Sequence, residues 1–465
     1  MTDYNVLENN VSLSSQYAQL MAAVAEDPQL QNLQIMEYPE AESIGKFYKC
    51  GVGTWPLIFS QARKQEFEKI ISTLPALIRK AIRIYFGKDG RLFSNYLQMG
   101  DSIFNMLDQV ELDKRDFVQR FDLLYSSHQC KVLEINAGTN LGLWEVDWLC
   151  GYIDEIFSRF PKLNLIKLAH KQVMDSLITA LFNSVSRLKA ATPNGNVLFI
   201  TEEFTEQGIA GIHASFERVK AKFVNKFPNA TMAFCHQPEQ LECLSNNTVR
   251  FNGIIFDAVL VSHRELPPSL HLKLVSSFLA GKLHYPDNPF QVMIGNKLLM
   301  AVLHEDNVLS EVTNSEAEFI KAYIPWSKRL IEQQVNWEGK EYQLSDLLKE
   351  QQNRFVLKKG ESMAGKDVIV GQVTDRQEWI GLIDEKLNSV GWLIQEFCPP
   401  DRVQNSDIFG FCEVEPVWGI YDFGQAYCGG AARAARVGKL KGVINAATGA
   451  NIYLMAEAAK QKLSI

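Results

Sequence analysis

Apolar residues recur at helical spacing in a long segment near the start of the chain. Between Phe67 and Phe86 they return every three or four positions, which predicts a helix with one buried face. Pro75 lies inside this segment and predicts a break or kink, because proline removes a backbone hydrogen bond. A shorter helix is predicted from Gln16 to Val24, within an N-terminal extension over residues 1–45. The apolar positions of the long helix are Phe67, Ile70, Ile71, Leu74, Leu77, Ile78, Ala81 and Ile82.

The middle of the chain alternates short apolar runs with helical patterns. Such alternation predicts a small α/β unit with a parallel sheet, which is the usual shape of a substrate-binding subdomain. The last third is rich in β-type segments joined by glycine turns, with helices predicted at Trp326–Val335 and Trp379–Val390. The elements predicted for the middle are helices at His170–Leu188 and Ile212–Phe227 and strands at Asn196–Thr201 and Gly253–Val261.

Length and charge narrow the class of protein. A chain of 465 residues exceeds the size that one hydrophobic core supports, so we expect two or three packed subdomains. With 47 Lys and Arg against 54 Asp and Glu, the net charge of −7 gives no general attraction to nucleic acid or anionic lipid. No secretory signal pattern, membrane-spanning run or C-x-x-C pair is visible. We therefore expect a cytoplasmic protein that binds neither nucleic acid nor membrane, and a homodimer is compatible with these features.

Two short runs bring oxygen-bearing side chains together. Arg120 and Asp122 lie on one run, Glu134 and Asn136 lie on the next, and the two runs could pair as neighbouring strands. Because side chains alternate along a strand, Glu134 and Asn136 share a face. Two carboxylates and an amide oxygen suit Mg²⁺ bound together with phosphate oxygens. On spacing alone, a salt bridge between Arg120 and a carboxylate is the favoured interpretation.

Two lysines favour the magnesium and phosphate interpretation over a simple salt bridge. Lys297 follows a glycine turn, and Lys358 ends the apolar run FVL, where a cation needs an anion or must stay exposed. Phosphate oxygens would supply the anion that both lysines need. The loop that follows, with Gly360 and Gly365, could close over a triphosphate through its backbone amides. It is not a Walker A loop, because Asp367 stands where Ser or Thr would be required.

The C-terminal third holds further candidates. The run WLIQEF, with Gln395, Glu396 and Phe397 at its end, could present backbone groups to an adenine ring or be an ordinary buried strand. Arg433 and Arg436 could clamp anionic oxygens or form surface ion pairs. The remaining candidates are Asn445, in a loop that could order over a nucleotide, and Arg264, a substrate contact or a surface ion pair.

Taken together, these segments resemble a known family. RFDLLYSSHQCKVLEINAGTNLGLWE resembles the metal-binding segment of glutathionylspermidine synthetases and of eukaryotic-type glutathione synthetases. GNKLLMAVLHED and FVLKKGESMAGKDVIVG resemble their paired lysine strands and lid loop. IQEF resembles their adenine hinge, and ARAARVGKLKGVINAATGAN resembles their late arginine-rich loop. The lid here is poorer in glycine than the family's loop, and no amidase domain precedes the synthetase-like part.

The resemblance implies a site for ATP and Mg²⁺. Glu134-x-Asn136 precedes both lysines and the hinge, whereas ordinary ATP-grasp chains have this motif last, so the resemblance implies a circularly permuted ATP-grasp fold. The implied metal ligands are Asp122, Glu134, Asn136 and, from the lid, Glu361. The implied ATP contacts are Lys297, Lys358, Gly360, Gly365, Gln395, Glu396, Phe397 and Asn445. The implied catalytic arginines are Arg120, Arg433 and Arg436.

The expected architecture is an α/β (α+β) chain with four parts. After the extension, residues 46–160 would carry the metal site and residues 161–290 the parallel substrate-binding subdomain. Residues 291–465 would bind the nucleotide, with a mobile lid over about 356–395. The expected activity is ligation of a small-molecule carboxylate to an amine, through an acyl phosphate, with release of ADP and phosphate. The alternatives are a peptide ligase of natural-product biosynthesis and a catalytically silent ATP-binding scaffold.

Overall fold

A computed structural model gives the fold of the chain. Arg264 and residues 212–216, the start of a predicted helix, lie outside the residues that it describes. None of the described helices is both long and apolar enough to cross a membrane. The described residues are 6–107, 116–188, 194–201, 217–262, 266–362, 365–424, 426–440 and 442–459.

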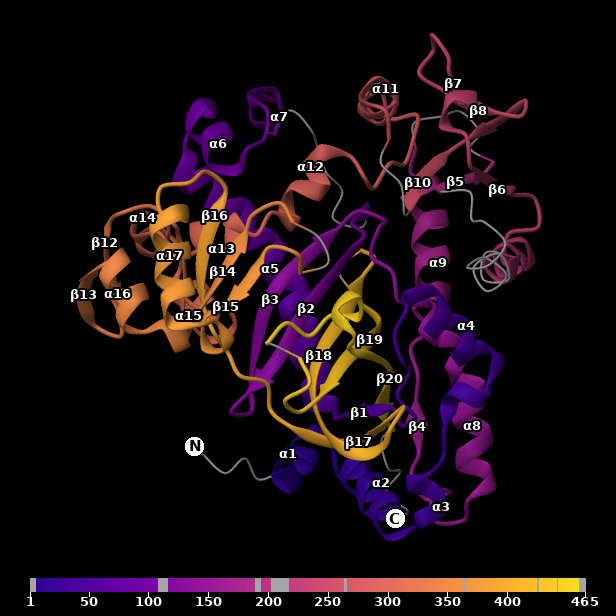
Figure 1. Ribbon diagram of the computed structural model, residues 1–465. Coiled ribbons are helices and arrows are strands. Elements are labelled where there is room, and N and C mark those ends of the chain that lie inside the picture. Colours follow the sequence, from indigo (N-terminus) through magenta and orange to yellow (C-terminus); the bar gives the residue numbers. More distant parts are fainter. Residues whose placement is uncertain are drawn as a thin grey trace.

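The largest element is an eight-stranded sheet built from both ends of the sequence. Its main path runs β1-β20-β19-β18-β2-β3, with β17 paired to β18 and β4 paired to β20. Strand β2 therefore pairs with β18, which comes almost three hundred residues later, and β3 follows β2 at the edge of the sheet, as Figure 1 shows in yellow and purple. The strands are β1 (Leu57–Phe59), β2 (Gln119–Ser126), β3 (Gln129–Ala137), β4 (Leu168–Ala169), β17 (Val403–Asp407), β18 (Gly410–Asp422), β19 (Tyr427–Arg436) and β20 (Asn451–Ala458).

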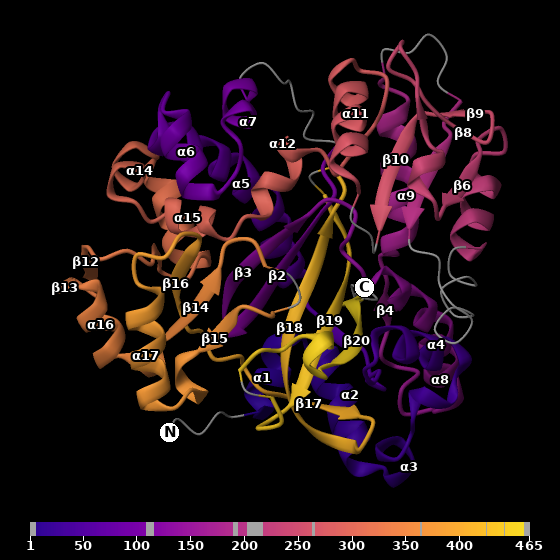
Figure 2. The same cartoon turned by 45° about the horizontal axis from the view of Figure 1, so that its top comes forward.

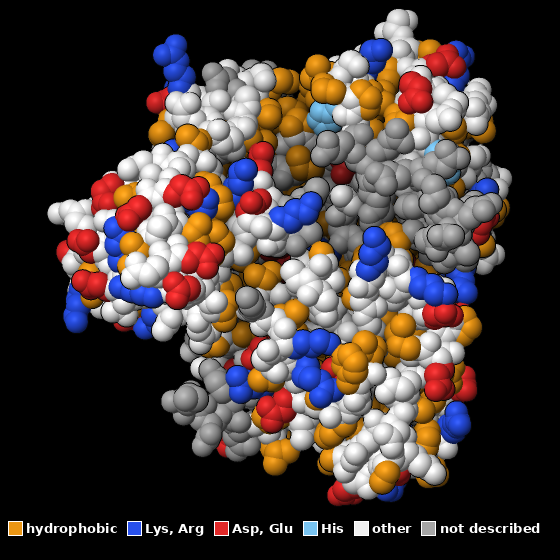
Figure 3. Space-filling model, in the orientation of Figure 1, with side chains coloured by type: hydrophobic (Ala, Val, Ile, Leu, Met, Phe, Trp, Pro, Cys, Tyr) orange, Lys and Arg blue, Asp and Glu red, His pale blue; other side chains and the backbone are white. Residues whose placement is uncertain are grey.

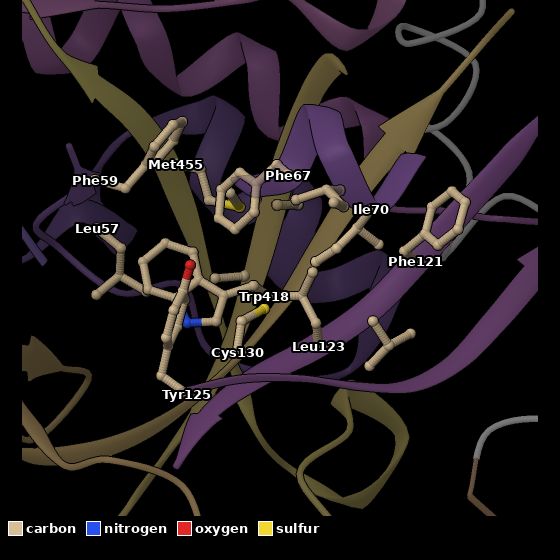
Figure 4. Packing of buried hydrophobic residues seen from close by; sticks show 14 of the residues in the cluster. Leu57, Phe59, Phe67, Ile70, Phe121, Leu123, Tyr125, Cys130, Trp418 and Met455 are labelled. Atoms are coloured by element: carbon tan, nitrogen blue, oxygen red, sulfur yellow. The ribbon is translucent and has the colours of Figure 1, made fainter. Parts of the chain in front are cut away.

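The predicted long helix packs on this sheet as α5 (Gln61–Phe86). Figure 4 shows Phe67 and Ile70 of α5 against Trp418 and Leu123 of the sheet. The helix continues through Pro75, so the chain is not split there; a kink at Pro75 stays a prediction. Apolar side chains on both sides of Pro75 are buried, and their packing outweighs one missing backbone hydrogen bond.

The N-terminal helices belong to the main core. Tyr17, Leu20 and Val24 are fully buried in the same hydrophobic cluster as α5 and the large sheet. These helices are thus packed against the body of the molecule, in the region where the sequence predicted an extension. These helices are α1 (Val6–Leu13), α2 (Ser15–Glu26), α3 (Pro28–Gln31) and α4 (Pro39–Tyr48).

The middle of the chain forms the predicted parallel unit. Its sheet has the order β10-β5-β6, and both strand pairs are parallel. The strand predicted from Gly253 is divided into two by Asp257, which accepts a hydrogen bond from the backbone of Asn196. The elements are α9 (Val173–Val185), β5 (Val197–Thr201), a helix over residues 217–226, β6 (Met232–Cys235), β7 (Glu242–Cys243), β8 (Val249–Phe251), β9 (Ile254–Phe256), β10 (Ala258–Ser262) and α11 (Pro268–Leu279).

A four-stranded sheet with the order β11-β16-β14-β15 forms a further lobe. The helix predicted at Trp326–Val335 is wrong, because β11 pairs with β16 there and the pairing overrides local helix preference. The helix predicted from Trp379 is confirmed as α17. The elements are β11 (Ser327–Arg329), β12 (Gln334–Trp337), β13 (Lys340–Gln343), α16 (Leu344–Glu350), η6 (Gln352–Arg354), β14 (Phe355–Lys359), β15 (Val368–Val370), η7 (Gly371–Val373), α17 (Arg376–Lys386) and β16 (Trp392–Glu396).

The parallel sheet and the four-stranded sheet belong to two lobes beside the large sheet. Figures 1 and 2 show the α16 and α17 lobe on one side of β2 and β3, and the parallel unit beyond the far end of β3. Acidic and basic side chains are interspersed over the α16 and α17 lobe (Figure 3). The connecting elements are η1 (Ile35–Glu37), α6 (Gly90–Leu97), α7 (Asp101–Met106), η3 (Trp144–Leu149), α8 (Cys150–Arg159), η4 (Pro238–Gln240), α12 (Pro289–Val292), η5 (Met293–Gly295), α13 (Leu298–Val302), α14 (Asp306–Glu311), α15 (Asn314–Tyr323) and η8 (Ala446–Thr448).

Candidate functional site

A pocket lies between the large sheet and the four-stranded sheet. It encloses about 770 Å³, part of it open to solvent. Its walls come from β2, β3, β18 and β19 of the large sheet and from β14, β15 and β16 of the four-stranded sheet. Residues 442–445 also line it. The lining residues are Asp122, Leu124, Leu133, Glu134, Val356, Lys358, Gly365, Val368, Val370, Gln395, Glu396, Phe397, Cys398, Pro400, Val417, Arg433, Gly442, Val443, Ile444 and Asn445.

The predicted pairing of the two acidic runs is confirmed. Strands β2 and β3 are antiparallel, with Asp122 opposite Glu134 and Arg120 opposite Asn136. A register irregularity follows Asp122, at the point where the strands enter the pocket. The alternation of side chains along the two strands therefore brings all four polar groups to one region.

Asp122 is the centre of this polar cluster. Its carboxylate accepts hydrogen bonds from Arg120 Nε at 2.7 Å, Arg120 Nη2 at 3.1 Å and Asn136 Nδ2 at 3.0 Å. Arg433 Nη2 lies 2.8 Å from Asp122 Oδ2. Burial alone would raise the pKa of Asp122, but the charges of Arg120 and Arg433 hold it well below its usual range. Asp122 is therefore a permanently charged link between two buried arginines.

The two late arginines lie on opposite faces of β19. Arg433 is 4% exposed and lines the pocket, and its Nε has no hydrogen-bond acceptor among the described residues. Arg436, three positions later on the strand, binds Asp407 instead, at 3.0 and 2.7 Å. The structure thus does not bring Arg436 to the pocket, because an odd spacing on a strand reverses the face.

Both predicted lysines lie next to Glu134. Lys358 Nζ donates to Gln395 Oε1 at 2.6 Å and to the carbonyl of Leu133 at 3.3 Å. Burial, assisted by the charge of Lys297, lowers the pKa of Lys358 to about 8, although Glu134 acts in the opposite direction. A buried ammonium with a lowered pKa is a group that an anion would stabilise.

Lys297 reaches the same region from a different element. It directly precedes α13 and is not part of a strand, which differs from the family resemblance. Lys297 Nζ lies 3.3 Å from Glu134 Oε2 and donates to the carbonyl of Ser362 at 2.7 Å. The lysine therefore connects the acidic strand to the loop after β14.

Of the two glycines in the loop after β14, one lines the pocket and the other does not. Gly365 lines the pocket. Gly360 does not, and its N–H donates to the carbonyl of Gly391 at 2.7 Å. A Cβ on Gly360 would come within 2.8 Å of Leu298, so glycine is required there for close packing. Glu361 is exposed and is not among the pocket-lining residues, and Met363 and Ala364 lie outside the described part of the chain.

The predicted hinge lines the pocket at the end of β16. The N–H groups of Glu396 and Phe397 already donate to backbone carbonyls, both at 2.7 Å. Within the described residues, the next N–H, that of Cys398, has no acceptor. The sequence interpretation missed Cys398, although its place between the strand and two prolines was a usable signal. Asn445 also lines the pocket, and its side chain accepts a hydrogen bond from Ala447 N at 3.0 Å.

The donor set at the acidic end fits Mg²⁺ held jointly with phosphate. The described residues contain no group of three or more His, Cys, Asp and Glu side chains arranged around a metal position. Asp122 and Glu134 supply two carboxylates, and the amide of Asn136, which contacts Asp122 through Nδ2, carries a further oxygen. Mg²⁺ is commonly bound by one or two carboxylates, with phosphate and water oxygens completing the shell. These residues would thus require a phosphate ligand to complete a magnesium site.

Comparison with known proteins identifies the fold. No family model matches the chain, and no curated protein matches it in sequence. Among solved structures, the chain is similar to the apo form of a glutathione synthetase-like effector (GSS30) from Globodera pallida. The TM-score is 0.56 with 12% sequence identity, over 93% of this chain and 99% of that chain. The chain therefore has a mixed α/β fold similar to that of a glutathione synthetase-like protein.

Proposed function

We propose that this protein is an ATP-dependent carboxylate–amine ligase. One observation carries the proposal: a single pocket between two sheets is lined by Asp122, Glu134, Lys358 and Arg433 and also by the residues at the end of β16. The oxygen ligands and cations suit a triphosphate with Mg²⁺, and the hydrogen-bonding strand end with its apolar neighbours suits a base. The glutathione synthetase-like fold is consistent with this proposal.

The finer architecture is part of the same proposal. We propose a circularly permuted ATP-grasp fold, in which β2 and β3 supply the metal ligands before the nucleotide-binding lobe appears in sequence. Residues 46–160 and 291–465 would form the two walls of the nucleotide site, and residues 161–290 would bind substrate. The loop after β14 would be the mobile lid, held in the structure by the contact between Lys297 and Ser362.

The chain's own groups would bind and orient the reactants. Lys358 and Lys297 would hold phosphate oxygens, and the N–H of Cys398 would donate to the base. Arg433, whose Nε has no acceptor in the described structure, would bind the γ-phosphate or the substrate carboxylate together with Arg120. When bound, Mg²⁺ would neutralise phosphate charge beside Asp122, Glu134 and Asn136. Glu361, Gly360 and Arg436 have no support from the pocket geometry for the roles predicted from sequence.

The reaction needs no protein nucleophile. A substrate carboxylate oxygen would attack the γ-phosphorus, the bond to the β,γ-bridging oxygen would break, and ADP would leave. An amine would then attack the acyl phosphate, phosphate would depart, and the amine would lose one proton to form the amide. The protein would supply alignment and preorganised positive charge, and a closed lid would exclude water from the acyl phosphate.

Two alternatives differ in what the pocket does. A peptide ligase of natural-product biosynthesis would use the same groups with an amino acid or short peptide as acid. A silent scaffold would bind ATP without turnover. The unpaired Nε of Arg433 and the lowered pKa of Lys358 favour a site that handles anions, and both alternatives share that property.

Phosphate release tests the proposal directly. The protein is mixed with ATP, Mg²⁺ and pools of carboxylates and amines, and we expect release that requires both an acid and an amine. Glu134→Gln should lower that rate by two or three orders of magnitude, by analogy with the loss of other preorganised charges. Glu413→Gln, on an exposed position of β18, is the matched control. Tight ATP binding without release from any pool would establish the scaffold instead.

A further inference from the structure

A half-buried carboxylate joins three parts of the molecule at the end of β3. Asp287 accepts hydrogen bonds from Thr139 N at 2.7 Å and from Val261 N at 3.1 Å. The Thr139 hydroxyl lies 2.5 Å from Asp287 Oδ2 and accepts a hydrogen bond from Val261 N at 2.8 Å. Thr139 follows β3, Val261 lies in β10, and Asp287 begins the connection to Lys297. We call this group of three residues the junction.

Among the described residues, which leave out 263–265, no Lys, Arg or His side chain forms an ion pair with Asp287. Burial raises the pKa of Asp287 to about 6, and its hydrogen bonds to Thr139 and Val261 only partly oppose that rise. Removing a carboxylate from water costs free energy, and the described partners that offset this cost are the hydrogen bonds from Thr139 and Val261.

The backbone is shaped around this carboxylate. Gly138 has φ +92°, a conformation that favours glycine, and a Cβ there would lie 2.6 Å from Asp287 Oδ1. Its N–H donates to the carbonyl of Val118 at 3.0 Å. The sequence Gly138-Thr139 therefore lets the chain pass close to Asp287 and present two hydrogen-bond donors to it.

The junction lies where the parts of the proposed site meet. Val261 is near the carboxyl end of β10, and ligands of open parallel sheets bind at the carboxyl ends of the strands. The strand before Thr139 carries Glu134 and Asn136. The connection after Asp287 runs through α12 and η5 to Lys297, and Gly295 on this path packs against the backbone of β3, with its Cβ position 3.1 Å from Ile135 O.

We propose that Asp287 and Thr139 are positioning residues that set the parallel unit against the metal-binding strand. Their contacts would align a substrate held at the carboxyl end of β10 with the phosphate end of the nucleotide pocket. The proposal rests on the ligase function for its kinetic consequence. Its structural consequence, the coupling of β10 to β3, can be measured without any turnover.

Thr139→Val and Thr139→Ser form a matched pair, because valine keeps the shape and serine keeps the hydroxyl. We expect Thr139→Val to change the Kd for ATP less than twofold, since the nucleotide pocket does not include this residue. Its amine-dependent phosphate release should fall on the order of 100-fold, as misplacement of reactants does. The amides of 258–262 should exchange hydrogen at least tenfold faster, and Thr139→Ser should restore both properties.

Phosphate release and hydrogen exchange test the ligase function and the positioning role separately. If the wild-type chain shows no amine-dependent release, the ligase function is wrong, and hydrogen exchange still decides whether the junction couples β10 to β3. If Thr139→Val keeps wild-type exchange in residues 258–262, or keeps the wild-type rate of an active ligase, the positioning role is wrong. Asp287→Asn provides the same comparison if Thr139→Val does not fold, with the same expected loss of protection.

Discussion

Lys358 Nζ lies 2.6 Å from Gln395 Oε1, so the proposed phosphate-binding lysine of β14 is held by the strand that ends at the proposed base site. The amide of Gln395 also contacts Ser327 Oγ at 3.2 Å, which orients its oxygen toward the lysine. Gln395 is 1% exposed. Gln395, predicted as a direct ATP contact, lines the pocket and also supports Lys358.

The lowered pKa of Lys358 predicts proton uptake on ATP binding. In the free protein this lysine has a pKa of about 8, so it is largely neutral at pH 9 and largely charged at pH 7. Phosphate favours the ammonium form and raises the pKa, so binding at pH 9 should take up close to one proton and binding at pH 6.5 almost none. Affinity should accordingly decrease as the pH rises through 8.

Calorimetry in buffers of different ionisation enthalpy measures this proton uptake. Lys358→Met should abolish the pH-dependent part of the uptake. Lys359→Met is the matched control, because Lys359 is the next residue on β14 and is exposed. Equal uptake in the wild type and Lys358→Met at pH 9 would show that another group titrates.

Substitution by methionine should affect activity and ATP binding at Arg433 but not ATP binding at Arg436. Arg433→Met removes one of two cations from buried Asp122, so phosphate release should fall by about 100-fold or more. Breaking a buried pair should also lower the free energy of unfolding by about 3 to 5 kcal/mol. Arg436→Met should leave the Kd for ATP within about twofold, because its partner Asp407 is outside the pocket.

Titration of ATP binding together with thermal unfolding separates the two effects. A loss of ATP affinity in Arg436→Met equal to that in Arg433→Met would contradict the assignment of the two side chains to opposite faces. Stability data alone do not discriminate, since Asp407 is also buried and loses its partner.

Period-two alternation made the acidic cluster predictable. Asp122 and Glu134 lie on short strands whose polar positions stand out from apolar neighbours, so their pairing followed from the pattern. Alternation does not place Arg433 and Arg436 in the same way, because an alanine- and glycine-rich run does not by itself distinguish a strand from a loop. Within the junction, Thr139 and Asp287 are far apart in sequence, and the local pattern of apolar and polar residues does not indicate their contact.

Tertiary pairing and burial explain the remaining differences. The run after Trp326 has helical spacing of apolar residues, yet β11 is needed to pair with the buried strand β16. The early helix around Leu20 was predicted correctly as a helix, but its partner surface on the large sheet comes from other parts of the chain. Local sequence gives the amphipathic face and does not give the surface that covers it.

The N–H of Cys398 should contribute to recognition of the base. Cys398→Pro removes this donor and leaves the following prolines in place, so ATP affinity should fall by about three- to tenfold, the value of one neutral hydrogen bond. Cys398→Ala keeps the N–H and should bind ATP with nearly wild-type affinity. Equal affinities in the two variants, measured by calorimetry with unchanged melting temperatures, would assign base recognition to other groups.

The buried position of Leu20 predicts that the N-terminal helices stabilise the whole molecule. Leu20 is fully buried in the cluster that includes α5, so Leu20→Ala should lower the free energy of unfolding by about 2 to 5 kcal/mol through lost burial and a cavity. Leu7, on the preceding helix, is 65% exposed, and Leu7→Ala should change the same quantity by about 0.5 kcal/mol or less. Denaturant unfolding monitored by tryptophan fluorescence measures both variants in one transition. If residues 1–45 were instead a separate extension, Leu20→Ala would leave the main unfolding transition where it is in the wild type, because the large sheet would keep its own core.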